Sequence, residues 1–183
     1  MPHLQLTLLG AFQATLDGEP VAGFESNKVR ALLAYLAAEA DRPHPRTTLA
    51  CLLWPERPDC DALANLRYAL SNLRQAIGDR TTDPPFLLIT HDTLQFNALS
   101  DHRLDVAAFE ALIGQGDPSA LQAAVSLCPG DFLEGFALVD SAPFEEWLTL
   151  KREQVNRRLF RALRCLADHC ERQGEYEQAR YYA

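Results

Sequence analysis

The chain begins with a regular alternation of apolar and polar residues. Leu4, Leu6 and Leu8 alternate with polar residues, and the same period of two returns over residues 12–16. A period of two places successive side chains on opposite faces of the backbone, so the pattern predicts half-buried strands. Gly10 interrupts the alternation, which predicts a bend or a break into two strands.

A helical period replaces the alternation after residue 26. Apolar residues recur every three or four positions from Val29 to Ala37, behind Ser26, a residue type that caps helices. A second, short helix is expected from Leu49 to Trp54, with Thr47 or Thr48 as its cap.

The third helical segment covers about residues 60–77 and is followed by a predicted hairpin. Its aliphatic residues recur at steps of three and four, and they are Leu63, Leu66, Leu70, Leu73 and Ile77. Gly78 favours termination of the helix at this point. Two apolar segments within residues 86–97 flank His91-Asp92, which predicts a hairpin with a two-residue turn. Two helices and a hairpin in this order are the layout of a winged helix.

The second part of the chain changes to helical periodicity throughout. Amphipathic helices are predicted over residues 105–113, 119–127, 143–173 and 176–183. We therefore expect residues 101–183 to be all-helical, with a domain boundary between residues 100 and 101. Trp147 falls on the apolar face of the long helix, so we expect it to support the core of residues 101–183.

Composition and charge limit the classes of function. The chain of 183 residues is 48% hydrophobic and carries 17 basic and 25 acidic side chains, for a net charge of −8. This balance argues against a general nucleic-acid or anionic-membrane binder, so a DNA contact requires a local patch. Neither a membrane-length apolar segment nor a signal-peptide pattern is present, which predicts a soluble, cytoplasmic protein with no membrane partner. Five scattered cysteines do not suggest a disulfide framework.

The third helical segment offers such a patch. No acidic residue occurs from Ala62 to Gly78. Arg, Asn and Gln side chains read base edges in the major groove, and Ser and Tyr suit phosphates. The candidate DNA-binding residues on this helix are Asn65, Arg67, Tyr68, Ser71, Asn72, Arg74 and Gln75, and Lys28 and Arg46 are candidate phosphate contacts outside it. The alternative is an ordinary solvated helix face.

Several ordered motifs resemble those of the SARP-type bacterial transcriptional activators. They are NKVRALLAYL at 27–36, PRTTLACLLWP at 45–55, ANLRYALSNLR at 64–74, GDFLEGF at 130–136 and FEEWL at 144–148. The resemblance runs over nearly the whole chain. It implies an α+β protein, with an OmpR/PhoB-type winged helix-turn-helix over residues 1–100. A TPR-like, all-α bacterial transcriptional activation domain over residues 101–183 would follow.

The resemblance also implies roles and partners. Arg67 and Arg74 would lie on the recognition helix, and the hairpin over about residues 86–97 would be the wing. The loop Pro55–Asp59 matches one that can touch RNA polymerase in OmpR/PhoB-type proteins, although it could be a mere connector. Winged helices of this type sit head to tail on direct repeats, so we expect self-association on double-stranded DNA. The last residues look like the opening of a TPR helix, which suggests a fragment of a longer regulator.

Nothing in the sequence points to an enzyme. There is no phosphate-binding GxxxxGK[ST] loop and no arrangement typical of a nucleophile and its base. Cys165, His169 and Cys170 share one helix without a second cluster at zinc-ligand spacing, so we expect neither a metal nor a cofactor. Two alternative functions stay open. One is a protein-interaction module whose winged helix no longer binds DNA, and the other is a signal relay whose output domain lies beyond residue 183.

Overall fold

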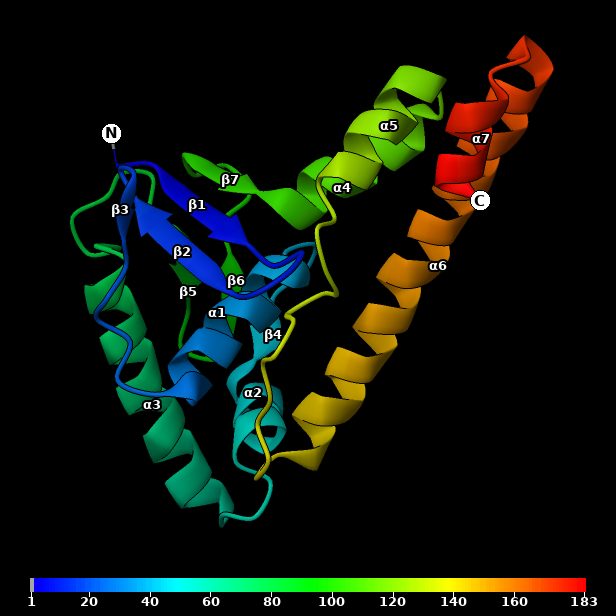
Figure 1. Ribbon diagram of the computed structural model, residues 1–183. Helices are drawn as coiled ribbons and strands as arrows, with labels where there is room; N and C mark the ends of the chain where they lie inside the picture. The colour runs from blue at the N-terminus through cyan, green and yellow to red at the C-terminus, as the bar shows by residue number, and fades with distance from the viewer. Residues whose placement is uncertain (1) are drawn as a thin grey trace. The chain divides into compact units, whose positions relative to one another are not determined.

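The computed structural model describes residues 2–183 and has the predicted α+β class (Figure 1). The chain forms two compact units that are interleaved along the sequence. The first, here the winged-helix unit, comprises the residues up to Leu6, Gln13–Leu104 and Phe136–Trp147. The second, the helical unit, comprises Thr7–Phe12, Asp105–Gly135 and Leu148–Ala183. The assignment of residues 1–100 and 101–183 to two domain families stays a prediction.

The first sheet of the winged-helix unit contains one strand that the sequence pattern did not predict. Its order is β3-β2-β1-β7. The strands are β1 (Leu4–Thr7), β2 (Gln13–Leu16), β3 (Glu19–Pro20) and β7 (His102–Leu104). Strand β7 runs parallel to β1, with Leu6 opposite Leu104. The expectation that residues 101–183 are all-helical is therefore wrong at residues 102–104, because three residues are too few to show a period and the pairing partner lies far away in sequence.

Three helices form the centre of this unit, namely α1 (Asn27–Ala38), α2 (Arg46–Leu53) and α3 (Asp59–Ala76). Ser26 occupies the predicted N-cap position of α1, although its side chain makes no capping hydrogen bond. Helix α2 begins at Arg46, three residues before the predicted start, and Pro45 rather than a threonine is its N-cap. The expected cap at Thr47 or Thr48 is wrong because both residues already lie inside the first turn of the helix.

The aliphatic face of α3 is confirmed as the side that packs inward. Leu66, Leu70 and Leu73 are buried, and Ile77 is fully buried just after the helix ends. Helices α1 and α2 both pack against α3. Because α3 buries this face, its opposite face is left toward solvent.

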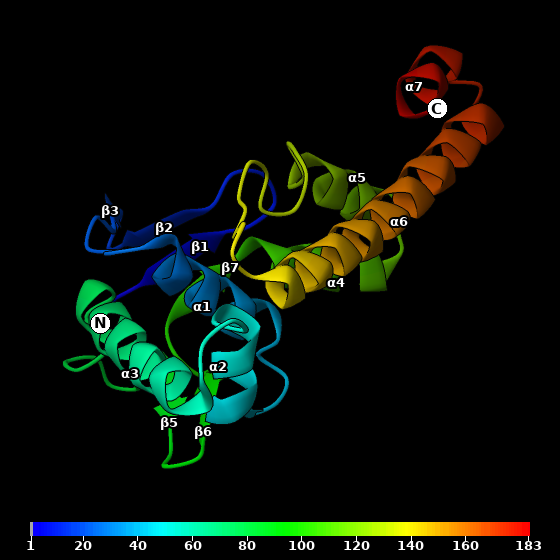
Figure 2. The same ribbon diagram turned by 90° about the horizontal axis from the view of Figure 1, so that it is seen from below.

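The predicted hairpin is confirmed and belongs to a second sheet of order β4-β6-β5. Its strands are β4 (His44–Pro45), β5 (Leu87–Ile89) and β6 (Thr93–Phe96). The Thr90 amide donates to the Thr93 carbonyl at 3.0 Å, which closes the two-residue turn. Figure 2 shows this turn beside α2 and α3. Strand β4, which was not predicted, pairs with β6 and joins the start of α2 to the hairpin.

The helical unit is built from α4 (Asp105–Gln115), α5 (Pro118–Ser126), α7 (Tyr176–Tyr182) and the part of α6 (Ala142–Gln173) that follows Trp147. Its core joins Leu121 of α5 to Ala162 and Leu166 of α6, with Ile113, Val125 and Tyr182 packed against them. Helix α5 begins with Pro118 and is capped by Asp117, which accepts a hydrogen bond from the Ala120 amide. Within residues 2–183, no helix combines the length and the apolar content required to cross a membrane.

Candidate nucleic-acid interface

Four of the predicted DNA-binding residues form one exposed face of α3. Arg67, Tyr68, Ser71 and Gln75 are all exposed, and we call them the α3 face. They share a side of the helix because they are spaced by steps of one, three and four residues. Tyr68 is 76% exposed, so its ring and hydroxyl are accessible from solvent.

A groove lies between this helix, the start of α2 and the turn of the hairpin. Arg46 and Thr47 line it from α2, Arg67 lines it from α3, and His91-Asp92 lines it from the hairpin turn. The Arg46 guanidinium donates to the Thr90 carbonyl at 2.9 Å, and its backbone amide donates to the Asp92 carbonyl at 2.9 Å. The hairpin turn is thus fixed to the start of α2, so the groove has a defined shape.

His91 and Arg80 lie near the α3 face, and neither is among the residues that the sequence pattern predicts to bind DNA. The His91 ring contacts the Asp92 carboxylate at 2.6 Å on the hairpin turn. The Arg80 guanidinium donates to the Ser71 hydroxyl at 3.1 Å. Two signals in the sequence could have indicated these residues. His91 lies in a two-residue turn, and Arg80 lies just after the helix stop at Gly78.

Arg74, in contrast, is held by a buried carboxylate. Its Nε donates to Asp79 Oδ2 at 2.9 Å, and the Asp79 side chain is 0% exposed whereas that of Arg74 is 34% exposed. The other oxygen of Asp79 accepts the backbone amide of Leu87 at the start of β5. Arg74 therefore links α3 to the hairpin, a structural role that competes with the predicted contact to DNA.

Asn72 also has a structural role. Its amide nitrogen donates to the Gly23 carbonyl at 2.9 Å, and its oxygen accepts the Glu25 amide at 3.1 Å. One of its two N–H donors and one of its two acceptor lone pairs are thereby used on the loop before α1. Base reading by Asn72 would compete with these two hydrogen bonds.

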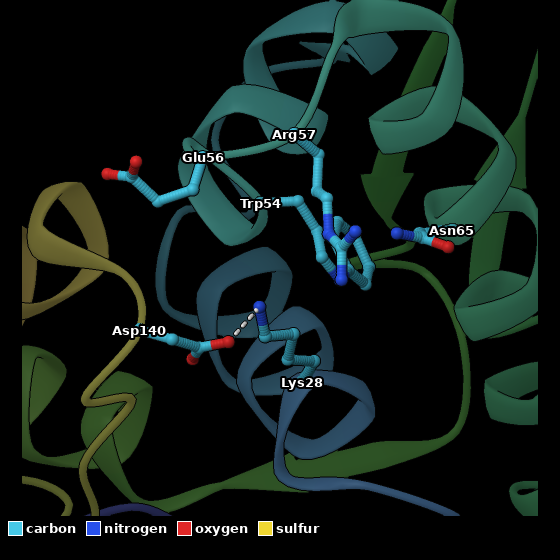
Figure 3. Close-up of a pocket in the computed structure, with 6 residues that line it drawn as sticks. All are labelled: Lys28, Trp54, Glu56, Arg57, Asn65 and Asp140. Carbon is cyan, nitrogen blue, oxygen red and sulfur yellow. Dashed lines mark ion pairs between the residues drawn. The ribbon is translucent and has the colours of Figure 1, made fainter.

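Lys28 and Asn65 line a different pocket, at the junction of α1 with the loop between α2 and α3 (Figure 3). The other residues that line it are Trp54, Glu56, Arg57 and Asp140. Figure 3 shows the Lys28 ammonium pointing toward the Asp140 carboxylate, and the two groups are 2.7 Å apart. The charge of Lys28 is thus already paired, which leaves Arg67 and Arg46 as the predicted cations on the groove beside the α3 face.

No group of three metal-ligating side chains is found within residues 2–183 that could hold a metal ion. Cys170 is buried, whereas Cys165 is exposed on the other side of the same helix. The cysteines and the histidine of α6 therefore do not converge on one point.

The two units define the class of the protein as a winged helix-turn-helix with a helical domain. The chain is 34% identical over 109 residues to the transcriptional regulatory protein EmbR of Mycobacterium tuberculosis and to that of Mycobacterium bovis. That match covers 60% of this chain and 28% of the relatives' length. The homology confirms the predicted resemblance to SARP-type regulators, and the relatives are named as regulatory proteins, not as an enzyme.

The fold is also confirmed by a solved structure. Mycobacterium tuberculosis EmbR in complex with a low-affinity phosphopeptide matches with a TM-score of 0.68 and 25% identity. The match covers 96% of this chain and 50% of that chain, so the present chain spans about half the length of its relative. No family model matches the chain.

Proposed function

We propose that the chain is a DNA-binding transcriptional regulator whose helix α3 enters the major groove and whose β5–β6 hairpin lies along the adjacent minor groove. The observation that carries the proposal is the acid-free α3 face beside the groove of Arg46, Arg67 and His91. A regulator of this kind works on the bacterial chromosome, so we expect it in the cytoplasm.

The contacts favour particular roles within the interface. Arg67 and Gln75 suit base edges, and within residues 2–183 neither side chain has a hydrogen-bonding partner that would have to be given up. Tyr68 and Ser71 suit phosphates. Arg74, Asn72 and Lys28 have structural partners, so we expect most of the specific affinity to depend on Arg67.

Replacing Arg67 with alanine tests this assignment directly. A duplex that the full chain enriches from a random-sequence pool serves as the probe, and affinity is measured by fluorescence anisotropy over a series of salt concentrations. If Arg67 reads a base, the substitution should cost about 1–3 kcal/mol and relax specificity at one position. If it binds a phosphate, affinity should fall for all sequences and the salt slope should decrease by about one.

Arg103→Ala is the matched control, since it removes the same charge from an exposed position on β7. It should bind the probe as the parent does. An Arg67→Ala protein that also binds as the parent does would remove α3 from the interface. Failure to enrich any duplex would favour the second candidate, a protein-interaction module, for which the net charge of −8 is the supporting observation.

Weak binding to a single site and self-association on DNA form the next part of the proposal. The negative net charge opposes binding to DNA, so one copy should bind weakly. Two half-sites in direct repeat, about one helical turn apart, would place two copies on the same side of the duplex. We expect tighter binding per site to the two-site probe than to the one-site probe at matched salt. Equal affinity per site would show that no cooperative pair forms.

RNA polymerase is the proposed protein partner, through the loop Pro55–Asp59. Glu56, Arg57, Pro58 and Asp59 in this loop are exposed. The loop joins α2 to the N-terminal end of α3, so a polymerase bound to it would lie next to the helix that reads DNA.

A further inference from the structure

Side chains from two distant parts of the winged-helix unit cap the carboxyl end of α2. Ser141, which is fully buried, donates its hydroxyl hydrogen to the Leu52 carbonyl. The Lys28 ammonium donates to the Leu53 carbonyl at 2.8 Å. The last carbonyls of a helix have no partner within the helix, so these two hydrogen bonds define where and how α2 ends.

The same lysine connects Asp140 to the loop that follows α2. The Lys28 ammonium lies 2.7 Å from the Asp140 carboxylate and 5.3 Å from the centre of the Trp54 ring (Figure 3). A cation at this distance from an indole is attracted to the face of the ring. The hydrogen bond from Lys28 lowers the pKa of the Asp140 carboxyl.

Two hydrogen bonds fix the turn that carries Asp140 and Ser141. The Leu138 amide donates to the Glu145 carboxylate, and the Glu145 amide donates to the Ser141 carbonyl at 3.1 Å. These reciprocal bonds fasten the turn to the first turn of α6. A turn that is fixed in this way can hold the end of α2 in one position, whereas a mobile turn could not.

We propose that Ser141 and Asp140 are positioning residues that set the geometry of the loop between α2 and α3, residues 54–58, and thereby its presentation to RNA polymerase. The inference rests on the proposed contact between this loop and the polymerase. It adds a role for residues far away in sequence, which act on the loop through the Leu52 carbonyl and through Lys28.

Hydrogen exchange on the full chain tests the first half of the inference. The reporters are the amides of Trp54, which donates to the Ala50 carbonyl, and Arg57, which donates to the Trp54 carbonyl. Ser141→Ala removes one hydrogen bond from the end of α2, so exchange at both amides should rise by about threefold to tenfold. Ser126→Ala is the matched control, because its hydroxyl also donates to a backbone carbonyl but lies in α5.

A second variant keeps the test valid if Ser141→Ala fails to fold. Asp140 is 67% exposed, so Asp140→Lys should fold while placing a like charge beside Lys28. It should raise exchange at the same two amides. Unchanged exchange in Asp140→Lys, or in a folded Ser141→Ala, would overturn the inference.

A transcription assay distinguishes a positioning role of Asp140 from general structural support. The enriched duplex is placed upstream of a minimal promoter, and transcripts are measured with purified RNA polymerase at saturating regulator. At this saturating concentration Asp140→Lys should occupy the enriched duplex as the parent does and yield less transcript by about threefold or more, as expected when a binding loop is displaced. Parental transcript yield together with faster exchange would overturn the link to the polymerase. Failure of DNA enrichment would contradict the proposed function, and the exchange result would still decide whether residues 140 and 141 position the loop.

Discussion

Replacing Trp147 with alanine is expected to destabilise the winged-helix unit by about 3 kcal/mol, at the lower end of the range for truncating a buried Phe or Trp because the indole is half-buried. The indole ring lies 4.9 Å from the Tyr35 ring and 5.1 Å from the Phe144 ring, measured between centroids. Its Nε1 donates to the Glu39 carboxylate at 3.0 Å. The expectation that Trp147 supports residues 101–183 is therefore wrong, since these contacts lie largely with α1 of the winged-helix unit.

Urea unfolding followed by tryptophan fluorescence measures this effect. The chain has two tryptophans, so Trp54 is the single remaining reporter in the variant and it lies in the winged-helix unit. Phe160→Ala is the matched control, because this aromatic residue of α6 is 68% exposed and should change stability little. An unfolding midpoint for Trp147→Ala equal to that of Phe160→Ala would show that the aromatic cluster does not stabilise the unit.

Asp79→Ala is expected to destabilise the winged-helix unit by an amount similar to that for Trp147→Ala. The substitution leaves the Leu87 amide without its acceptor and the Arg74 guanidinium without its counter-ion. Removing one partner of a buried ion pair costs about 3–5 kcal/mol, and the partial exposure of Arg74 places this pair at the lower end. Thermal unfolding monitored by circular dichroism should show a clearly lower midpoint than for Asp41→Ala, an exposed control in the same unit.

A double-mutant cycle with Arg74→Met identifies the cause. If the two side chains act as a pair, the loss of stability in the double variant should be smaller than the sum of the losses in the two single variants. Strict additivity would mean that Asp79 stabilises the unit through Leu87 alone. In that case Arg74 would be available for DNA, as the sequence predicted.

Helix α3 and the hairpin could be predicted because their signals are local. Leu66, Leu70 and Leu73 face inward at the spacing that the periodicity required, and the turn at His91-Asp92 has the predicted two residues. The start of α2 was misplaced by three residues because Pro45, not a threonine side chain, begins the helix.

The roles of individual polar residues could not be predicted in the same way. Periodicity indicates that Asn72 and Arg74 lie off the apolar face of α3, and this is correct. It does not show that the loop at Gly23–Glu25 and the carboxylate of Asp79 fold back onto them. Those partners are set by tertiary packing, so a helical wheel overestimates the number of residues that remain available for DNA.

The parallel pairing of β1 with β7 limits how the winged-helix unit can be shortened. A fragment that ends at residue 100 would lack His102–Leu104, which hydrogen-bond along β1. Strand β1, with Leu4 and Leu6, would then become an open edge of the sheet, and open apolar edges recruit strands from other molecules. Such a fragment should form soluble oligomers or precipitate through intermolecular strand pairing. Because Trp147 also contacts α1, a monomeric fragment needs the residues through Trp147 and not only residues 1–100.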